Sequence, residues 1–249
     1  PGDVADTIAQ DAGGLDAEVM AQIRKDYGLD LPLWHQMMKY FSGVARLDLG
    51  YSFYYNQPVT TLILEKVPAT LLLVISAQIV SIFLGVMFGV IAARKPNGIT
   101  SHFVTMLSLV GYAAPVFWTG IMLIILFASI VPIFPIGNMV DVSIEREGFA
   151  YIMDVLHHLA LPTIALSSIF LALYSRLARA SMLDVLGSDY VRTAQAKGLS
   201  EFQVVFKHAL RNALLPVVIT AGLAFSGIVS GAVLVESVFS WPGLGTLAV

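Results

Sequence analysis

Four stretches of the chain contain no Asp, Glu, Lys or Arg, and they cover residues 67–93, 103–140, 159–175 and 212–235. Their lengths are 27, 38, 17 and 24 residues. About 20 residues of α-helix cross the roughly 30 Å hydrocarbon core of a bilayer. The first and last stretches therefore predict ordinary transmembrane helices, and the whole pattern predicts at least four spans.

The two middle stretches differ in length from a single transmembrane span. The third is short, and we expect its helix to continue toward Leu186. The second is longer than one span needs, and Pro132 and Pro135 predict that its helix stops near Val131. Pro115 lies inside this stretch, where it should kink the helix or free a carbonyl group. A hinge that lines a pathway and an ordinary packed kink are both compatible with that position.

Composition narrows the class of protein. Of 249 residues, 57% are hydrophobic and 12% are charged, with no cysteine and a mean hydropathy of +0.80. A soluble domain has about twice that share of charged residues. These values exclude a soluble enzyme, a disordered tail and a secreted disulfide scaffold, and they favour an all-α polytopic membrane protein.

Charged residues are divided unevenly between the segments that flank the spans. Segments 94–102 and 176–211 hold eight basic and three acidic residues, whereas 1–66, 133–158 and 236–249 hold six basic and 14 acidic residues. Basic residues mark the cytoplasmic side of a membrane protein. The sequence therefore predicts that the N-terminal segment lies outside and that loop 176–211 is cytoplasmic.

The polar N-terminal segment predicts two helices. Asp16 can cap a helix that runs to Tyr27, where Gly28 ends it. Pro32 can open a second, amphipathic helix, whose apolar positions are Leu33, Met37, Tyr40, Phe41 and Val44. This second helix suits the outer membrane surface, and packing on the protein's own bundle suits it equally.

Loop 176–211 predicts a projecting helical hairpin. Gly187 should stop the third span, and Ser188 can cap a short helix over 189–197 that Gly198 ends. Residues 200–203 then fit a capping box that starts another helix toward the membrane. A docking site for a partner and an ordinary cytoplasmic hairpin would both show this pattern.

The chain lacks the usual signatures of catalysis and of metal binding. It has no ionisable residue inside the four stretches, no His-Glu-x-x-His, no Gly-x-Ser-x-Gly and no Walker phosphate loop. We therefore expect no catalytic and no metal-ligating residue, and for His157 and His158 we favour hydrogen bonds over a metal. The pairs Gly85/Gly89 and Gly227/Gly231 predict close helix packing, within the chain or at a dimer seam.

Longer motifs carry a resemblance to a known family. Segments 190–200 and 207–216 resemble the cytoplasmic loop of the permeases of ABC importers, and most closely the subfamily for dipeptides, oligopeptides, nickel and glutathione. Residues 1–3, 31–34, 48–52, 68–71 and 235–245 match the same subfamily in the same order. Where the broader family has Glu-Ala-Ala, this chain has Arg192-Thr193-Ala194, which puts in doubt a role for an acidic side chain there.

The resemblance implies a type I ABC importer transmembrane domain, with four of six helices visible in this fragment. Residues 1–66 would be an extracytoplasmic segment after a missing first helix, and 67–249 the transmembrane domain with its coupling loop 176–211. The residues implied to dock on an ATPase are Tyr190, Arg192, Thr193, Ala194, Lys197, Gly198, Leu199 and Ser200.

The implied function is that of a permease subunit in the plasma or inner membrane, not an enzyme. It would form the pathway for peptides or a related small solute that a binding protein delivers outside the cell. The implied partners are a second permease subunit, identical or different, two ATPase subunits that hold ATP and Mg, and membrane lipid, with no nucleic acid and no cofactor on this chain. An ATP-independent secondary carrier or pore is the alternative, and a membrane scaffold without transport is a third possibility.

Overall fold

The computed structural model describes residues 14, 16–52 and 54–248. The chain divides into two compact units, 1–65 and 66–249, and each is described by itself. The expected boundary after residue 66 lies one residue from this division. The match of residues 1–3 to the family pattern falls outside the described residues.

The described residues of the first unit form two helices and a small hairpin. Helix α2 spans Ala17–Tyr27 and helix α3 spans Leu33–Ala45. Strands β1 (Tyr51–Ser52) and β2 (Gln57–Pro58) pair antiparallel. Gly28 ends α2 in the left-handed conformation, as predicted, with φ of 69°. Asp16 occupies the N-cap position, but its side chain makes no capping bond, and only its carbonyl oxygen accepts the Met20 N–H.

Helix α3 has the predicted amphipathic pattern. Leu33, Met37, Tyr40 and Phe41 are all exposed within the first unit, and no described residue of α3 is buried there. Its apolar face is therefore uncovered by the residues of its own unit.

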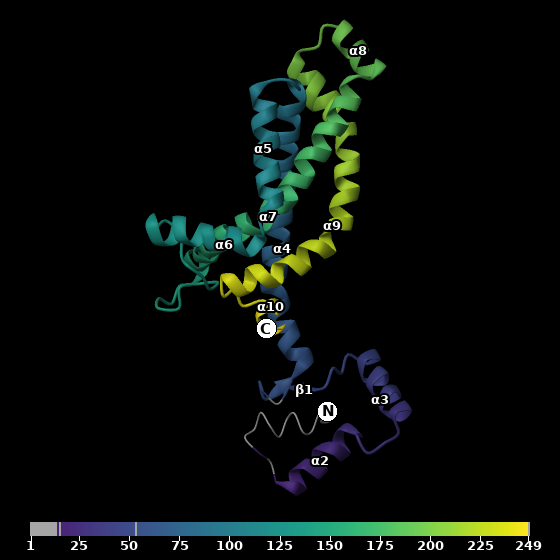
Figure 1. Cartoon of the computed structure of the whole chain (residues 1–249), viewed down its shortest axis with the longest axis vertical. Helices are drawn as coiled ribbons and strands as arrows, with labels where there is room; N and C mark the ends of the chain where they lie inside the picture. Colours follow the sequence, from purple (N-terminus) through teal and green to yellow (C-terminus); the bar gives the residue numbers. More distant parts are fainter. Residues whose placement is uncertain (1–13, 15, 53, 249) are drawn as a thin grey trace. The chain divides into compact units, whose positions relative to one another are not determined.

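Within the part of the chain that the structure describes, three helices that lie wholly or mostly in the second unit are long and apolar enough to cross a membrane (Figure 1). They are α4 (Val59–Arg94), α7 (Gly148–Leu186) and the segment Gln203–Val238. The last consists of a π-helical segment, η2 (Gln203–Ala209), followed by α9 (Leu210–Val238). A short α10 (Leu244–Ala248) follows. The prediction of an all-α polytopic membrane protein is confirmed.

The second apolar stretch is broken rather than straight. Helix α5 spans Ile99–Ala113, α6 spans Val116–Ile124, and the π-helical η1 (Ile125–Ile130) completes the run. The two halves meet at 103°, so the expectation of one helix up to Val131 was wrong, although the run does end there. Ala114 is extended because a residue before proline is driven out of the helical region. Pro115 then starts the second half.

The third span begins earlier than its apolar stretch. Helix α7 starts at Gly148, so residues 148–158, which were expected between two spans, are helical and continuous with the third apolar stretch. The helix continues through Asp154 because an ion pair with Arg146 compensates that buried charge. The other end behaves as predicted, since α7 runs to Leu186 and Gly187 follows it.

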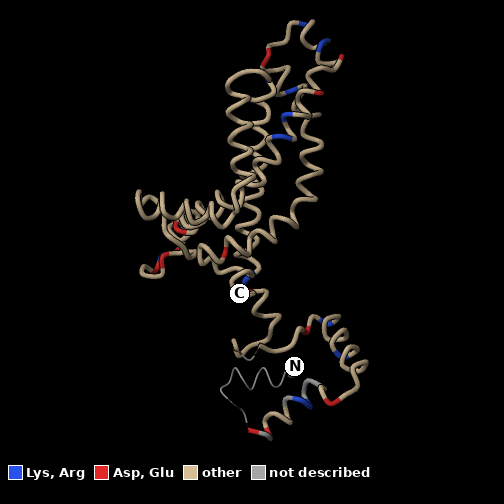
Figure 2. The backbone as a smooth tube through the Cα atoms, viewed as in Figure 1, with Lys and Arg blue, Asp and Glu red and all other residues tan. Residues whose placement is uncertain are grey.

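Three apolar clusters hold the second unit together, and the smallest contains Tyr174, Ala178 and Val217. The other two each join several elements. The larger joins α4, α6, α7 and α9 to the segment after α9, where Phe239 and Trp241 are fully buried. The smaller packs α8 (Asp189–Ala196) and η2 against the last turns of α4 and α7. In Figure 1 these two clusters lie toward opposite ends of the unit, which we call the α10 end and the α8 end. Figure 2 shows most Lys and Arg of this unit at or near the α8 end, while the middle of the bundle carries almost no charge.

Candidate functional site

The hairpin predicted in loop 176–211 forms the α8 end of the second unit (Figure 1). Helix α8 begins after Ser188 and ends at Ala196, with Lys197 as its C-cap, so it is one residue shorter than predicted. Gly198 follows with φ of +78°, the left-handed conformation that glycine adopts without steric cost. A methyl group at Gly198 would meet no atom within 4 Å, so only the backbone conformation restricts this position.

Of the two helix caps predicted in the hairpin, the structure contains one and lacks the other. Ser188 sits at the N-cap of α8, but its hydroxyl donates to the carbonyl of Val185 (2.6 Å) instead of capping α8, which corrects the prediction. The capping box is confirmed, because Gln203 N–H donates to Ser200 Oγ (3.4 Å) and Ser200 N–H donates to Gln203 Oε1 (3.3 Å). The helix after this box is π-helical over Gln203–Ala209, which no local sequence pattern predicted.

One face of the hairpin packs on the ends of the spans. Val191 and Ala194 of α8 are buried in a cluster with residues of α4, α7, η2 and α9: Val90, Ala93, Met182, Val204, Val205, Ala209 and Ala213. The Arg94 guanidinium at the end of α4 donates two hydrogen bonds to Glu201 Oε1, at 2.9 and 2.7 Å. Both side chains are exposed, so this ion pair contributes about 1 kcal/mol or less. Apolar contacts therefore do most to hold α8 on the bundle.

The opposite face of the hairpin is open. Arg192, Thr193, Lys197 and Ser200 are exposed, and Tyr190 is exposed while its hydroxyl accepts a hydrogen bond from Asn212 Nδ2 (2.8 Å). Ala194 is buried and Leu199 packs against the same apolar cluster, so these two predicted docking residues support the hairpin from within. The docking role of the other residues stays a prediction.

The two glycine pairs lie against α7, but at different distances. A methyl group at Gly85 would lie 2.7 Å from Tyr174 Cβ, and one at Gly89 would lie 2.6 Å from Ala178 Cβ. At Gly227 and Gly231 the nearest atoms would be 3.8 and 3.3 Å away, on the side chains of Phe170 and Leu166. Both pairs thus face a helix of the same chain.

A polar contact joins three spans midway along α4, and the sequence analysis missed it. Gln78 Nε2 donates to Tyr174 Oη (3.0 Å) on α7 and to the carbonyl of Ala221 (3.2 Å) on α9. Gln78 is uncharged, so it does not stand out among the residues of the uncharged stretch 67–93. Interhelical hydrogen bonds of this kind help to fix helices against one another in a bilayer.

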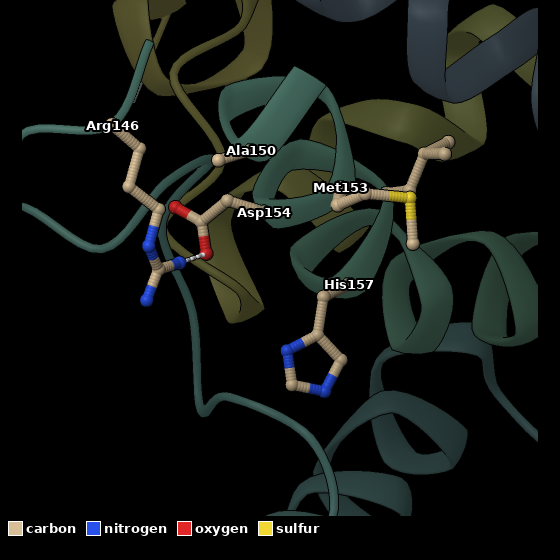
Figure 3. A pocket seen from close by; sticks show the side chains of 6 residues that line it. Arg146, Ala150, Met153, Asp154 and His157 are labelled. Carbon is tan, nitrogen blue, oxygen red and sulfur yellow. Dashed lines mark hydrogen bonds and ion pairs between the residues drawn. The ribbon is translucent and has the colours of Figure 1, made fainter. Parts of the chain in front are cut away.

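The start of α7 carries a polar cluster beside two hollows of about 550 and 450 Å³. Figure 3 shows residues that line the larger of the two. Arg146 donates to the buried Asp154 carboxylate, which also accepts the Asp141 N–H (2.9 Å). His157 Nε2 lies 2.8 Å from the carbonyl oxygen of Ile133, and His158 Nδ1 lies 2.9 Å from that of Asp154. Each histidine therefore has a hydrogen-bond partner, and the described residues contain no cluster of three groups suited to a metal.

The pair Arg146 and Asp154 was not predicted either, because residues 133–158 were expected to form a loop between two spans. The spacing of Asp154 and His158, one helical turn apart, was the available signal. In the same loop, hydrogen bonds from the Ser143 hydroxyl and main-chain N–H hold the pKa of the Asp141 carboxyl below its ordinary value.

Comparison with known proteins shows which family the chain belongs to. Residues 85–249 match the family described as the binding-protein-dependent transport system inner membrane component. The chain is 40% identical to the dipeptide transport system permease protein DppB of Escherichia coli K12, over 98% of this chain and 77% of that protein. It is also 40% identical to the di/tripeptide transport system permease protein DppB of Pseudomonas aeruginosa, over 98% of this chain and 77% of that protein. It is 39% identical to the oligopeptide transport system permease protein AppB of Bacillus subtilis, over 92% of this chain and 71% of that protein. The chain belongs to this permease family.

This membership fixes the kind of protein. The chain is a multi-pass membrane protein and the translocation subunit of a binding-protein-dependent ABC importer, with the type I transmembrane domain of that class. The permease is a transport subunit, and the ATPase of such an importer is a separate subunit. Membership also decides against an ATP-independent carrier, a pore and a membrane scaffold. The family match includes the hairpin, all four glycines and Pro115, whose individual roles stay predictions.

Proposed function

We propose that this permease carries short peptides or a related small solute into the cell, driven by ATP hydrolysis on two partner ATPase subunits. The relatives named for dipeptide, di/tripeptide and oligopeptide transport support the substrate class. The proposed assembly also contains a second permease subunit and an extracytoplasmic solute-binding protein. ATP and Mg belong to the ATPases, and this chain binds neither.

The observation that carries the coupling proposal is the packing of α8. Its inner face is buried against the ends of α4 and α7, and η2 leads directly into α9. A force on the open face of α8 would therefore reach three membrane-spanning helices at once. The exposed residues Tyr190, Arg192, Thr193 and Lys197 would face a cleft on the ATPase, and Gly198 would set the angle at which they do so.

In the proposed cycle, the two ATPases close when they bind ATP and move the two hairpins together. Each hairpin tilts its spans through the apolar cluster at the α8 end. The pathway then changes from inward to outward access, and the binding protein releases its substrate into it. The break at Ala114–Pro115 is the proposed hinge, since the two halves of that run already differ by 103° in direction.

We propose that residues 1–66 face outside and that loop 176–211 faces the cytoplasm, on the strength of the uneven charge. The chain contains no cysteine, so single reporter residues need no background changes. Ser42→Cys should react with an impermeant thiol reagent from outside, and Lys197→Cys should react only after the membrane is opened. Labelling of both residues from outside would overturn this orientation.

The transport proposal is tested by reconstitution of the complete complex in vesicles. We expect uptake of a labelled dipeptide that requires ATP and the binding protein and is abolished by vanadate. A labelled sugar of similar size serves as the control solute. Uptake of the dipeptide without ATPase subunits would contradict the proposal, as would ATP-dependent uptake of the sugar but not of the dipeptide.

A further inference from the structure

The α10 end of the second unit contains a fully buried carboxylate that the coupling proposal does not use. Glu236 lies in the last turns of α9 with 0% of its surface exposed. Among the described residues, none of the ion pairs includes it. A buried charge without a cation is costly unless hydrogen bonds compensate it, and such a residue in a membrane protein is rarely without a role.

Hydrogen-bond donors from two different elements satisfy the Glu236 carboxylate. The Thr70 hydroxyl on α4 donates to Oε1 (2.6 Å), and the Gly245 N–H on α10 donates to Oε2. Thr70 Oγ1 in turn accepts the N–H of Leu244 (2.8 Å), so its own proton is directed to the carboxylate. Both oxygens of Glu236 accept hydrogen bonds, which suits the ionised form.

The segment between α9 and α10 is tied to α4 a second time. The Trp241 indole N–H donates to the carbonyl of Ala69 (2.9 Å), and the Trp241 main-chain N–H donates to that of Glu236 (2.8 Å). Gly243 lies so close to the carboxylate that a side chain there would collide with it. On the other side, the Asn138 N–H donates to the carbonyl of Phe239 (2.9 Å). The segment is thus folded back on α4 rather than loosely connected.

We propose that Glu236 is a positioning residue for transport: its carboxylate latches α10 and the end of α9 onto α4 through Thr70. The latch joins α4, α9 and α10 at the end of the unit opposite α8 (Figure 1). Because η2 and α9 connect the hairpin with Glu236 without interruption, a displaced hairpin pulls on the latch. With the latch intact, α4, α9 and α10 move as one body at the α10 end. Without it, α9 moves alone and the displacement does not open the pathway. This role rests on the proposed function.

The test uses Thr70→Val in the full-length permease within the reconstituted complex, since this change removes the hydroxyl and keeps the volume. We expect dipeptide uptake per ATP hydrolysed to fall roughly tenfold or more, because the variant loses the hydrogen bond from Thr70 to the Glu236 carboxylate. Thr70→Ser keeps the hydroxyl and should transport as wild type. Thr163→Val is the matched control, since Thr163 is equally buried but its hydroxyl has no hydrogen-bond partner among the described residues.

A second measurement reports the latch itself. Leu247→Cys on α10 should react faster with an impermeant thiol reagent when Thr70→Val is added, while Ser237→Cys, exposed on α9, should react at the same rate in both backgrounds. Trp241→Phe removes the hydrogen bond from the indole N–H to the Ala69 carbonyl. It should likewise lower uptake per ATP hydrolysed and raise the reactivity of Leu247→Cys. This variant replaces Thr70→Val if Thr70→Val does not fold.

The outcomes separate the latch from a merely structural contact. An unchanged ratio of uptake to ATP hydrolysis in folded Thr70→Val permease would overturn the proposal, even if less permease is recovered. Equal loss in Thr163→Val would overturn it as well. If the wild-type complex carries no peptide, the proposed substrate class fails, and the thiol reactivity of Leu247→Cys still decides whether the latch exists.

Discussion

Helix α7 packs against α4 on one side and against α9 on the other, and the two contacts differ in how closely the backbones approach. At the α4 side, methyl groups at Gly85 and Gly89 would lie within 3.0 Å of main-chain oxygens of α7. At the α9 side, Gly227 and Gly231 face only side-chain atoms at 3.3 Å or more, and Gly222 faces open space.

This difference indicates which helices can move relative to one another. The α4–α7 contact is backbone against backbone, so a sliding motion would need the main chain to separate. The α7–α9 contact is made through side chains, which can change rotamer. Since α9 follows directly from the hairpin, the helix whose Gly227 and Gly231 meet only side-chain atoms of α7 is the one that a partner at α8 would move first.

The largest expected effect of a single change is at the tight contact. Gly89→Ala would bring Cβ within 2.7 Å of the carbonyl oxygen of Ser175, so α4 and α7 must separate. Overpacking of this kind costs about 1–3 kcal/mol, and here it meets backbone that cannot rotate away. We expect a clear loss of folded permease, measured as the monodisperse fraction in detergent and the midpoint of thermal unfolding.

Gly227→Ala is the matched control for that comparison. Its new methyl group would lie 3.8 Å from the Phe170 ring, an ordinary van der Waals distance, and alanine favours the helix over glycine. Its folded amount should equal or exceed that of wild type. Equal losses in the two variants would show that the contacts do not differ in the way described.

The next effect is on coupling rather than folding. Gly198→Val places a β-branched residue in the left-handed conformation, which costs about 1–2 kcal/mol and tilts α8 relative to η2. We expect the permease to insert in normal amount while dipeptide uptake is lost or ATPase subunits no longer co-purify. Gly198→Asn, which tolerates this conformation better, should retain most activity. Normal uptake by the valine variant at normal abundance would remove Gly198 from the coupling proposal.

The smallest effect is expected in the loop that leads into α7, away from both contacts. The pKa of Asp141 is lowered by its hydrogen bonds to Ser143, so these bonds favour the folded loop at neutral pH. They are lost as the pH falls below the ordinary carboxyl pKa of about 4. Amide hydrogen exchange in residues 141–147 should therefore rise, after correction for intrinsic rates, between about pH 6 and about pH 3. Asp141→Asn should show fast exchange throughout, and a wild-type loop without this rise would contradict the assignment.

Much of this fold could be predicted because membranes impose simple rules on sequence. Long uncharged runs marked the spans, and glycines marked helix ends. Gly28 and Gly198 adopt the left-handed conformation there, whereas Gly187 follows α7 in the right-handed helical region. The capping box at Ser200 and Gln203 was visible as a short local pattern. All of these signals lie within a few neighbouring residues.

The features that sequence reasoning missed depend on contacts between distant residues. Thr70 and Glu236 are 166 positions apart, and Gln78 meets Tyr174 across 96 positions. Asp154 looked like a loop residue because its partner Arg146 lies before the helix begins. Pro115 was expected to kink a helix rather than to break it, and the angle of 103° between the two halves also depends on how α6 packs on α7 and α9.

The uninterrupted helical run of 36 residues from Gln203 to Val238 sets both the distance between the hairpin and Glu236 and the direction in which Glu236 points around the helix axis. Each residue inserted into an α-helix rotates everything beyond it by about 100° and advances it by about 1.5 Å. A single insertion between the hairpin and Glu236 would therefore turn the carboxylate away from Thr70. The π-helical turns of η2 provide a place to absorb an extra residue, since their hydrogen bonds reach one position further. The number of residues in this interval, as well as their identity, is thus part of what the permease must preserve.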